Sequence, residues 1–167
     1  MSKSFYFGII IFSLVVMGGS YFLVAGGKQK SNGKLPVVYS SKDKEKPKAE
    51  VKETVEDLGN MKVSDQKSAN FLLKNSGSKP LVLSQITSSC GCTVGQVIID
   101  GKESQEFGMH AQSDETFTID PGKQVTIKVT YRPFIMPVSG PVERQVFVET
   151  NDPENPRLEF KVKANVQ

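Results

Sequence analysis

The chain of 167 residues has no tryptophan, one histidine and two cysteines, and these shortages limit the chemistry that it can carry. A Ser/His/Asp or Cys/His catalytic set would have to use His110, and no flanking signature supports such a set. The sequence also contains no glycine-rich phosphate loop and no paired-carboxylate pattern. We therefore expect a protein that is not an enzyme and that has no catalytic residues.

Basic residues do not predominate in the C-terminal two thirds of the chain. Residues 54–167 carry twelve basic and fourteen acidic side chains, so this part offers no basic face for nucleic acid. The net charge of +3 arises instead from residues 28–53, where eight lysines outnumber four acids. We expect no nucleic-acid partner.

Charged residues are also missing from Phe5 to Gly27, a run of 23 residues in which apolar side chains dominate. About 20 apolar residues span a bilayer as a helix, and Tyr6 and Tyr21 fall near the two ends, where aromatic rings favour the interface. We interpret residues 1–27 as a short leader followed by an uncleaved transmembrane signal-anchor. A cleaved signal peptide is the alternative, for which residues 24–27 form only a fair cleavage site.

Lysines lie on both sides of this segment, so charge alone does not settle its orientation. Lys3 precedes the segment, whereas Lys28, Lys30 and Lys34 follow it, which would place the C-terminal domain in the cytoplasm. An N-terminal apolar segment with a short polar leader commonly acts as an export signal, however. We predict a single-pass protein of the cell membrane whose C-terminal domain is extracytoplasmic. Residues 28–53, rich in Lys, Glu, Ser and Pro, are predicted to be a flexible linker.

Residues 54–167 are predicted to form one all-β domain, because short alternating runs are separated by turn signals. In the clearest run, apolar residues at 125, 127, 129 and 131 alternate with polar ones. The sequences Asp100-Gly101 and Asp120-Pro121-Gly122 mark turns. About seven short strands at this spacing predict an immunoglobulin-like β-sandwich. The pattern is lost over residues 102–115 and 134–141, which are predicted to be loops.

The two cysteines lie one residue apart in Cys90-Gly91-Cys92 and form the most chemically distinctive feature of the domain. Glycine between them removes side-chain bulk and permits unusual dihedral angles, so both sulfurs can turn to one side. Three interpretations remain open. In the first, the pair is a closely spaced disulfide, which an oxidising compartment favours but which would be strained. In the second, the two thiolates form a soft-metal site. In the third, the cysteines are two small buried residues at the corner of a strand.

Three further side chains would complete a ligand set for Cu(I), because thiolate, thioether and imidazole are plausible copper ligands. The set would consist of Cys90, Cys92, Met109, His110 and Met136. It requires the three loops that carry these residues to meet at one end of the sandwich. Without that convergence, the simpler interpretation is that His110 is exposed to solvent or makes a structural hydrogen bond, and that Met136 packs against other apolar side chains.

Several motifs occur in an order that resembles the bacterial DUF1573 family. They are Asp57-Leu58-Gly59, Phe71-Leu72-Leu73-Lys74-Asn75-Ser76-Gly77, Pro80-Leu81-Val82-Leu83, Ser89-Cys90-Gly91-Cys92-Thr93, Asp120-Pro121-Gly122 and Thr150-Asn151-Asp152-Pro153. The resemblance covers residues 55–167 and implies an immunoglobulin-like domain of unknown function, related to the domains shared by ASPM, SPD-2 and hydin. It also implies an exported protein that is often anchored to the membrane or to lipid, with no agreed activity.

We therefore expect a membrane-anchored extracytoplasmic module that binds another envelope protein without catalysis. Two alternatives depend on the cysteines. In one, Cys90 and Cys92 bind or deliver Cu(I) together with Met109 and His110. In the other, they form a redox pair that exchanges with the thiols of a partner.

Overall fold

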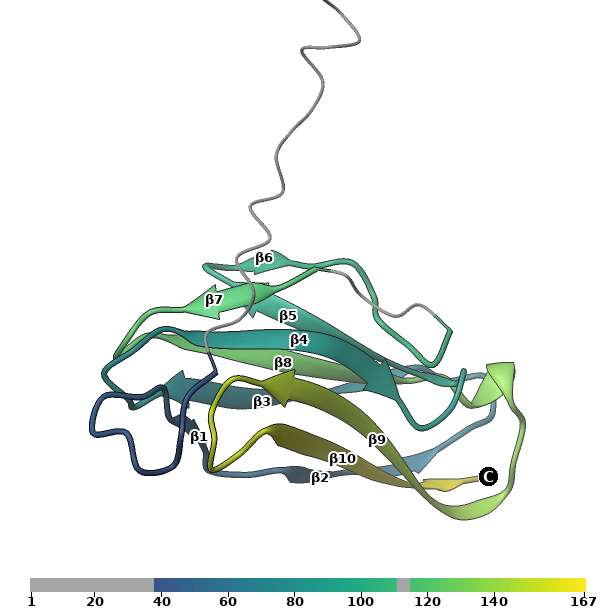
Figure 1. Cartoon of the computed structure of the whole chain (residues 1–167). Coiled ribbons are helices and arrows are strands. Elements are labelled where there is room, and N and C mark those ends of the chain that lie inside the picture. The colour runs from purple at the N-terminus through teal and green to yellow at the C-terminus, as the bar shows by residue number, and fades with distance from the viewer. Residues whose placement is uncertain (1–37, 111–114) are drawn as a thin grey trace, which may run out of the picture. The chain divides into compact units, whose positions relative to one another are not determined.

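The computed structural model describes residues 38–110 and 115–167 of the chain (Figure 1). The predicted transmembrane segment and the first part of the predicted linker lie outside the described residues. Within the described ranges, no helix has the length and apolar character needed to cross a membrane. The membrane anchor therefore stays a prediction from the sequence.

Ten strands form two five-stranded sheets that pack face to face (Figure 1). In order, the first sheet consists of β1 (Ala49–Val51), β3 (Lys67–Asn75), β8 (Gln124–Tyr131), β5 (Thr93–Ile99) and β6 (Lys102–Glu103). The second consists of β2 (Val55–Met61), β10 (Arg157–Val166), β9 (Gly140–Thr150), β4 (Leu81–Ser88) and β7 (Phe117–Ile119). A single 3-10 turn, η1 (Pro133–Ile135), completes the elements assigned to the described residues. The predicted all-β, immunoglobulin-like sandwich is confirmed, with ten strands in place of about seven.

The core lies between the two sheets because apolar side chains alternate along the long strands. In β3, the residues at 69, 71, 73 and 75 are buried and those between them are exposed. Phe71 of β3 contacts Phe160 of β10 across the sandwich, with ring centroids 5.3 Å apart. Burying an aromatic or aliphatic side chain of this size contributes about 1.5–3 kcal/mol, so these alternating positions hold the sheets together.

The sandwich begins before residue 54, within the segment predicted to be a linker. Strand β1 pairs with β3, and Ala49 is buried. The N–H of Ala49 donates a hydrogen bond to Oδ2 of Asp152 (2.9 Å), and the carbonyl of Lys48 accepts one from the N–H of Ser76 (2.9 Å). The lysine-rich composition conceals this strand, because its burial depends on partners that are distant in the sequence.

A β-bulge bends β4 before it reaches the cysteines. Ser84 pairs with Glu149 and Thr87 pairs with Phe147, so two residues of β4 face one residue of β9. Gln85 lies in the bulge with φ of 45°, a left-handed conformation that costs a non-glycine residue about 1 kcal/mol. The extra residue redirects the chain and aims the end of β4 at the cysteine turn.

The described chain starts at the end of the sandwich opposite to the cysteines. Val38 and Tyr39 line a surface pocket with Val82 and Pro156, near the beginning of β4. Cys90 follows the far end of the same strand. At about 3.3 Å per residue, β4 separates the two ends by about 20 Å.

Candidate functional site

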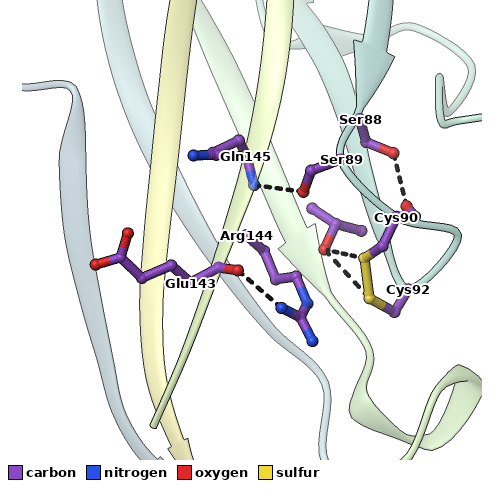
Figure 2. The surroundings of a disulfide bond; sticks show 8 residues. Ser88, Ser89, Cys90, Cys92, Glu143, Arg144 and Gln145 are labelled. Carbon is purple, nitrogen blue, oxygen red and sulfur yellow. Dashed lines mark hydrogen bonds between the residues drawn. A yellow bond between two sulfur atoms is a disulfide. The ribbon is translucent and has the colours of Figure 1, made fainter.

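Cys90 and Cys92 are joined by a disulfide bond whose Cα atoms lie 5.3 Å apart (Figure 2). The thiolates of a metal site are therefore absent from this state. Cys92 is fully buried, whereas Cys90 is only partly buried. The bond closes a loop of three residues, for which the chain-entropy model gives about 1.6 kcal/mol of stabilisation, compared with about 3 kcal/mol for a loop of 15 residues.

The turn that carries the disulfide is held by several hydrogen bonds of its own (Figure 2). The hydroxyl of Ser88 donates to the carbonyl of Cys90 (2.7 Å), and the N–H of Thr93 donates to the same carbonyl (3.3 Å). Ser89 and Gln145 exchange two further bonds, of 2.9 and 3.0 Å. The turn is thus tied both to itself and to β9.

Gly91 does not adopt the special conformation that the sequence suggested. The glycines with positive φ are those at positions 59, 101, 122 and 140. A Cβ atom built at Gly91 would have no neighbour within 4 Å. Neither backbone conformation nor space therefore requires glycine between the two cysteines.

Thr93 places its hydroxyl beside both sulfurs. Its Oγ1 lies 3.4 Å from Sγ of Cys90 and 3.9 Å from Sγ of Cys92. Because a disulfide sulfur carries no hydrogen, the threonine hydroxyl is the donor in these contacts. Thr93 is fully buried, so water does not compete for this hydroxyl.

Two buried polar atoms lie in the same corner. Tyr131 is the cross-strand partner of Thr93, and the Cζ atom of Arg144 lies 5.5 Å from the centroid of its ring. Arg144 is one of the residues that surround the disulfide in Figure 2. The hydroxyl of Tyr131 and Nε of Arg144 have no hydrogen-bond acceptor among the described residues. The corner thus has spare donors, which would stabilise negative charge.

The segment 106–110 packs against the disulfide turn. Phe107 is buried, and its backbone exchanges two hydrogen bonds with Gly95 of β5 (2.8 and 2.9 Å). A Cβ atom at Gly108 would lie 3.6 Å from the carbonyl oxygen of Thr93 and 3.8 Å from Oγ of Ser88. Met109, the next residue of this segment, therefore lies close to the cysteine turn.

The segment 132–136 meets the same turn through Arg132. Its N–H donates a hydrogen bond to the carbonyl of Cys92 (2.8 Å). Its guanidinium forms two hydrogen bonds with the carboxylate of Glu106, one of them 2.7 Å long between Nη1 and Oε2. The hydrogen bonds from Arg132 lower the pKa of Glu106, and they outweigh the opposing effect of burial. The three loops that the copper hypothesis requires thus meet at one end of the sandwich.

The side chains predicted as copper ligands differ in exposure at this end of the sandwich. Met109, His110 and Met136 are exposed, whereas Cys92 is buried. Across the described residues, there is no group of three or more His, Cys, Asp or Glu residues that could hold a metal ion. Disulfide sulfurs are also poor substitutes for the thiolates that Cu(I) selects. The Cu(I) hypothesis stays a prediction and applies only to the reduced protein.

Large apolar side chains on the two segments that contact the disulfide turn remain half exposed. They are Met109 (50% exposed), Phe134 (49%), Ile135 (47%) and Met136 (50%), and we call them the apolar tip. Sequence reasoning included the two methionines as ligands but missed Phe134 and Ile135. The signal was available, because three bulky apolar residues follow Pro133 in a segment without strand alternation. Where exposed large apolar side chains form a contiguous patch, they are candidates for an interaction site.

A family model for a protein of unknown function, DUF1573, matches residues 49–166 of the chain. A solved structure of a protein of unknown function from Porphyromonas gingivalis W83 is 20% identical, with a TM-score of 0.56, over 79% of this chain and 51% of that one. The ASH/PapD-like domain 7 of human CEP192 is 15% identical, with a TM-score of 0.47, over 78% of this chain and 95% of that one. No functionally curated protein matches the chain. The chain spans about half the length of the Porphyromonas protein, and this likeness concerns the fold alone.

Proposed function

We propose a function from one premise: the chain belongs to the DUF1573 family, whose function is unknown. The protein is a membrane-tethered, extracytoplasmic module that binds another envelope protein through the apolar tip and does not catalyse a reaction. The observation that carries this proposal is the exposure of four large apolar side chains on the two segments that contact the hydrogen-bonded disulfide turn.

The residue types of the apolar tip support a protein partner. Phenylalanine and methionine are enriched at protein interfaces, and the flexible thioether of methionine adapts to irregular surfaces. The ion pair between Arg132 and Glu106 holds the two segments of the tip together before a partner binds. Such preorganisation reduces the entropy that binding would otherwise cost.

The position of the tip supports its accessibility. The sequence predicts attachment to the membrane through residues 1–27, and the described chain begins at Val38. Val38 and the cysteines lie at opposite ends of β4. A partner at the apolar tip would therefore lie away from the point at which the described chain begins.

Site-specific photocrosslinking in intact cells tests the binding proposal. A photoreactive residue at Ile135 should give a discrete protein adduct, whereas the same probe at Leu72 should not. Leu72 is a matched control because it is also apolar and 47% exposed, but lies on the outer face of β3. The adduct partner, once identified and purified, should bind the Phe134→Ser chain at least about tenfold more weakly than the Leu72→Ser chain. Equal adducts at both positions, or lipid adducts alone at Ile135, would contradict the proposal.

The membrane tether has a separate test. We expect the full chain to remain in the membrane fraction after alkaline extraction, because an apolar helix of about 20 residues inserts stably. Protease added to cells whose outer barriers are permeabilised should digest the domain without lysis of the inner membrane. A chain that is extracted, or that is protected until lysis, would contradict the tether or its orientation.

A further inference from the structure

We propose that the Cys90–Cys92 disulfide is redox-active: a protein dithiol reduces it by thiol–disulfide exchange that starts at Sγ of Cys90. This activity goes beyond the non-covalent binding proposed above. Each of the two proposals can fail without the other, because binding at the apolar tip does not require exchange. Three features of the cysteine turn support the proposal that the disulfide is redox-active.

The first feature is the unequal exposure of the two cysteine residues. Cys92 is fully buried, whereas Cys90 is partly exposed at the rim of the sandwich. An attacking thiolate must reach one sulfur directly, and access decides which sulfur is attacked. The structure therefore selects Cys90 as the electrophile and Cys92 as the leaving group.

The second feature is the set of donors around the leaving group. The buried hydroxyl of Thr93 lies 3.9 Å from the Cys92 sulfur and 3.4 Å from the Cys90 sulfur, so it reaches both. A hydroxyl that donates to a charged acceptor forms a stronger bond than it forms with a neutral one. Thr93 therefore stabilises a thiolate on Cys92 more than it stabilises the disulfide. The guanidinium of Arg144, which Figure 2 shows among the residues around the disulfide, adds a positive charge to this corner.

The third feature is that the turn does not depend on the disulfide for its shape. Hydrogen bonds from Ser88, Thr93 and Arg132 hold the carbonyls of the two cysteines, and the Ser89–Gln145 pair anchors the turn to β9. The bond closes a loop of only three residues, so its loss frees little chain entropy. The disulfide can therefore open and close while the domain stays folded.

The exchange balances in two steps. A thiolate of the dithiol attacks Sγ of Cys90, the bond between Cys90 and Cys92 breaks, and its electron pair leaves on Cys92. The second thiol of the dithiol, as a thiolate, then attacks the dithiol sulfur that is bonded to Sγ of Cys90 and releases the thiolate of Cys90. Two electrons and two protons pass to Cys90 and Cys92, and the dithiol becomes a disulfide.

Reduced glutathione serves as the probe for the site of attack. The full chain in detergent is incubated with glutathione, quenched with acid, alkylated and analysed by fragmentation mass spectrometry. We expect the mixed disulfide on Cys90 and the alkyl group on Cys92. A peptide of residues 87–93, in which both sulfurs are exposed, should give both adducts and serves as the control. A mixed disulfide mainly on Cys92 of the full chain would overturn the proposal.

Equilibration with glutathione redox buffers tests the role of Thr93. The Thr93→Val chain should be at least about tenfold harder to reduce than the natural chain, because the thiolate loses a hydrogen bond. The Thr93→Ser chain keeps the hydroxyl and should recover most of this loss. A natural chain that stays oxidised in every glutathione buffer would overturn redox activity. If the Thr93→Val chain is reduced as easily as the natural chain, the hydroxyl of Thr93 does not stabilise the reduced state. The glutathione adduct on the natural chain decides the case even if the valine chain does not fold.

Discussion

The guanidinium of Arg132 binds the carboxylate of Glu106 in a bidentate ion pair, and this contact joins the two segments of the apolar tip. The backbone of Arg132 also donates to the carbonyl of Cys92. One residue thus connects the segment 106–110, the segment 132–136 and the disulfide turn. The tip is therefore a single preorganised surface rather than two independent loops.

The Glu106→Gln substitution should loosen this surface. We expect a loss of about 0.5–1 kcal/mol in the free energy of unfolding, because the pair is partly exposed and screened by solvent. Amide hydrogen exchange should become faster at residues 108–110. The Glu103→Gln substitution breaks the exposed pair with Lys128 instead and should leave exchange at residues 108–110 unchanged. The same exchange rates in both variants would show that the ion pair does not order the tip.

This ion pair also has a defined pH dependence. Arg132 lowers the pKa of Glu106 in the folded protein, so the pair stabilises the fold above the ordinary glutamate pKa of about 4.3. The contribution is lost as the pH falls through the lowered pKa of the folded state. The difference in stability between the natural chain and Glu106→Gln should therefore shrink on acidification.

Two glycines of the site should respond in opposite ways to alanine. A Cβ atom at Gly95 would lie 2.6 Å from Cγ1 of Val146, so Gly95→Ala should overpack the core and cost about 1–3 kcal/mol. Gly91→Ala meets no neighbour within 4 Å and should change stability by less than about 0.5 kcal/mol. Thermal unfolding and a thiol assay would measure both variants. A loss of the disulfide in Gly91→Ala would show that glycine is required there.

Local patterns predicted the elements that depend on neighbouring residues. The alternation over residues 125–131 became β8, and Asp100-Gly101 became a hairpin turn with φ of 50° and 78°. Strand β1 escaped prediction because the residue that accepts a hydrogen bond from Ala49 lies 103 positions away in the sequence. Strand β6 (Lys102–Glu103) escaped because it is short, polar and exposed.

The same distinction applies to the site. The cysteine pair was conspicuous in the sequence, but its oxidation state depends on how the backbone turns. The convergence of its three loops could only be stated as a condition, because it results from the pairing of β5 with β8 and from the bridge between Gly95 and Phe107. Exposure of both Phe134 and Ile135 is likewise a tertiary property, since in a strand of this sandwich one of two adjacent side chains would face the core.

Cu(I) titration should separate the copper hypothesis from protein binding at the apolar tip and from thiol–disulfide exchange. In the oxidised chain we expect no cysteine-dependent binding, because the disulfide leaves no thiolate for the metal. After reduction, binding that disappears in Cys90→Ser/Cys92→Ser and weakens in Met109→Leu/His110→Gln would support the predicted ligand set. Elemental analysis of the two forms provides the readout. Equal uptake by the natural chain and the double serine variant, under reducing conditions, would sink the hypothesis.

Asp152 should make a large polar contribution to the stability of the end of the sandwich near Val38. It is 1% exposed and accepts hydrogen bonds from Ala49, Glu154 and Asn155. Burial alone would raise the pKa of Asp152, but these hydrogen bonds outweigh it and lower the pKa. Asp152→Ala would leave buried donors without an acceptor, so we expect a loss of about 2–3 kcal/mol and detachment of β1.

Because the pKa of Asp152 is lower in the folded state, its contribution is complete above the ordinary aspartate pKa of about 3.9. It is lost as the pH falls through the folded pKa. Denaturant unfolding of Asp152→Ala between pH 7 and pH 2 should therefore converge on the natural chain at the acid end. Asp120 is the control, since its side chain is exposed in a turn and Asp120→Ala should change stability by less than about 0.5 kcal/mol. Equal losses in the two variants, or a loss in Asp152→Ala that is independent of pH, would show that the carboxylate of Asp152 does not hold β1 in place.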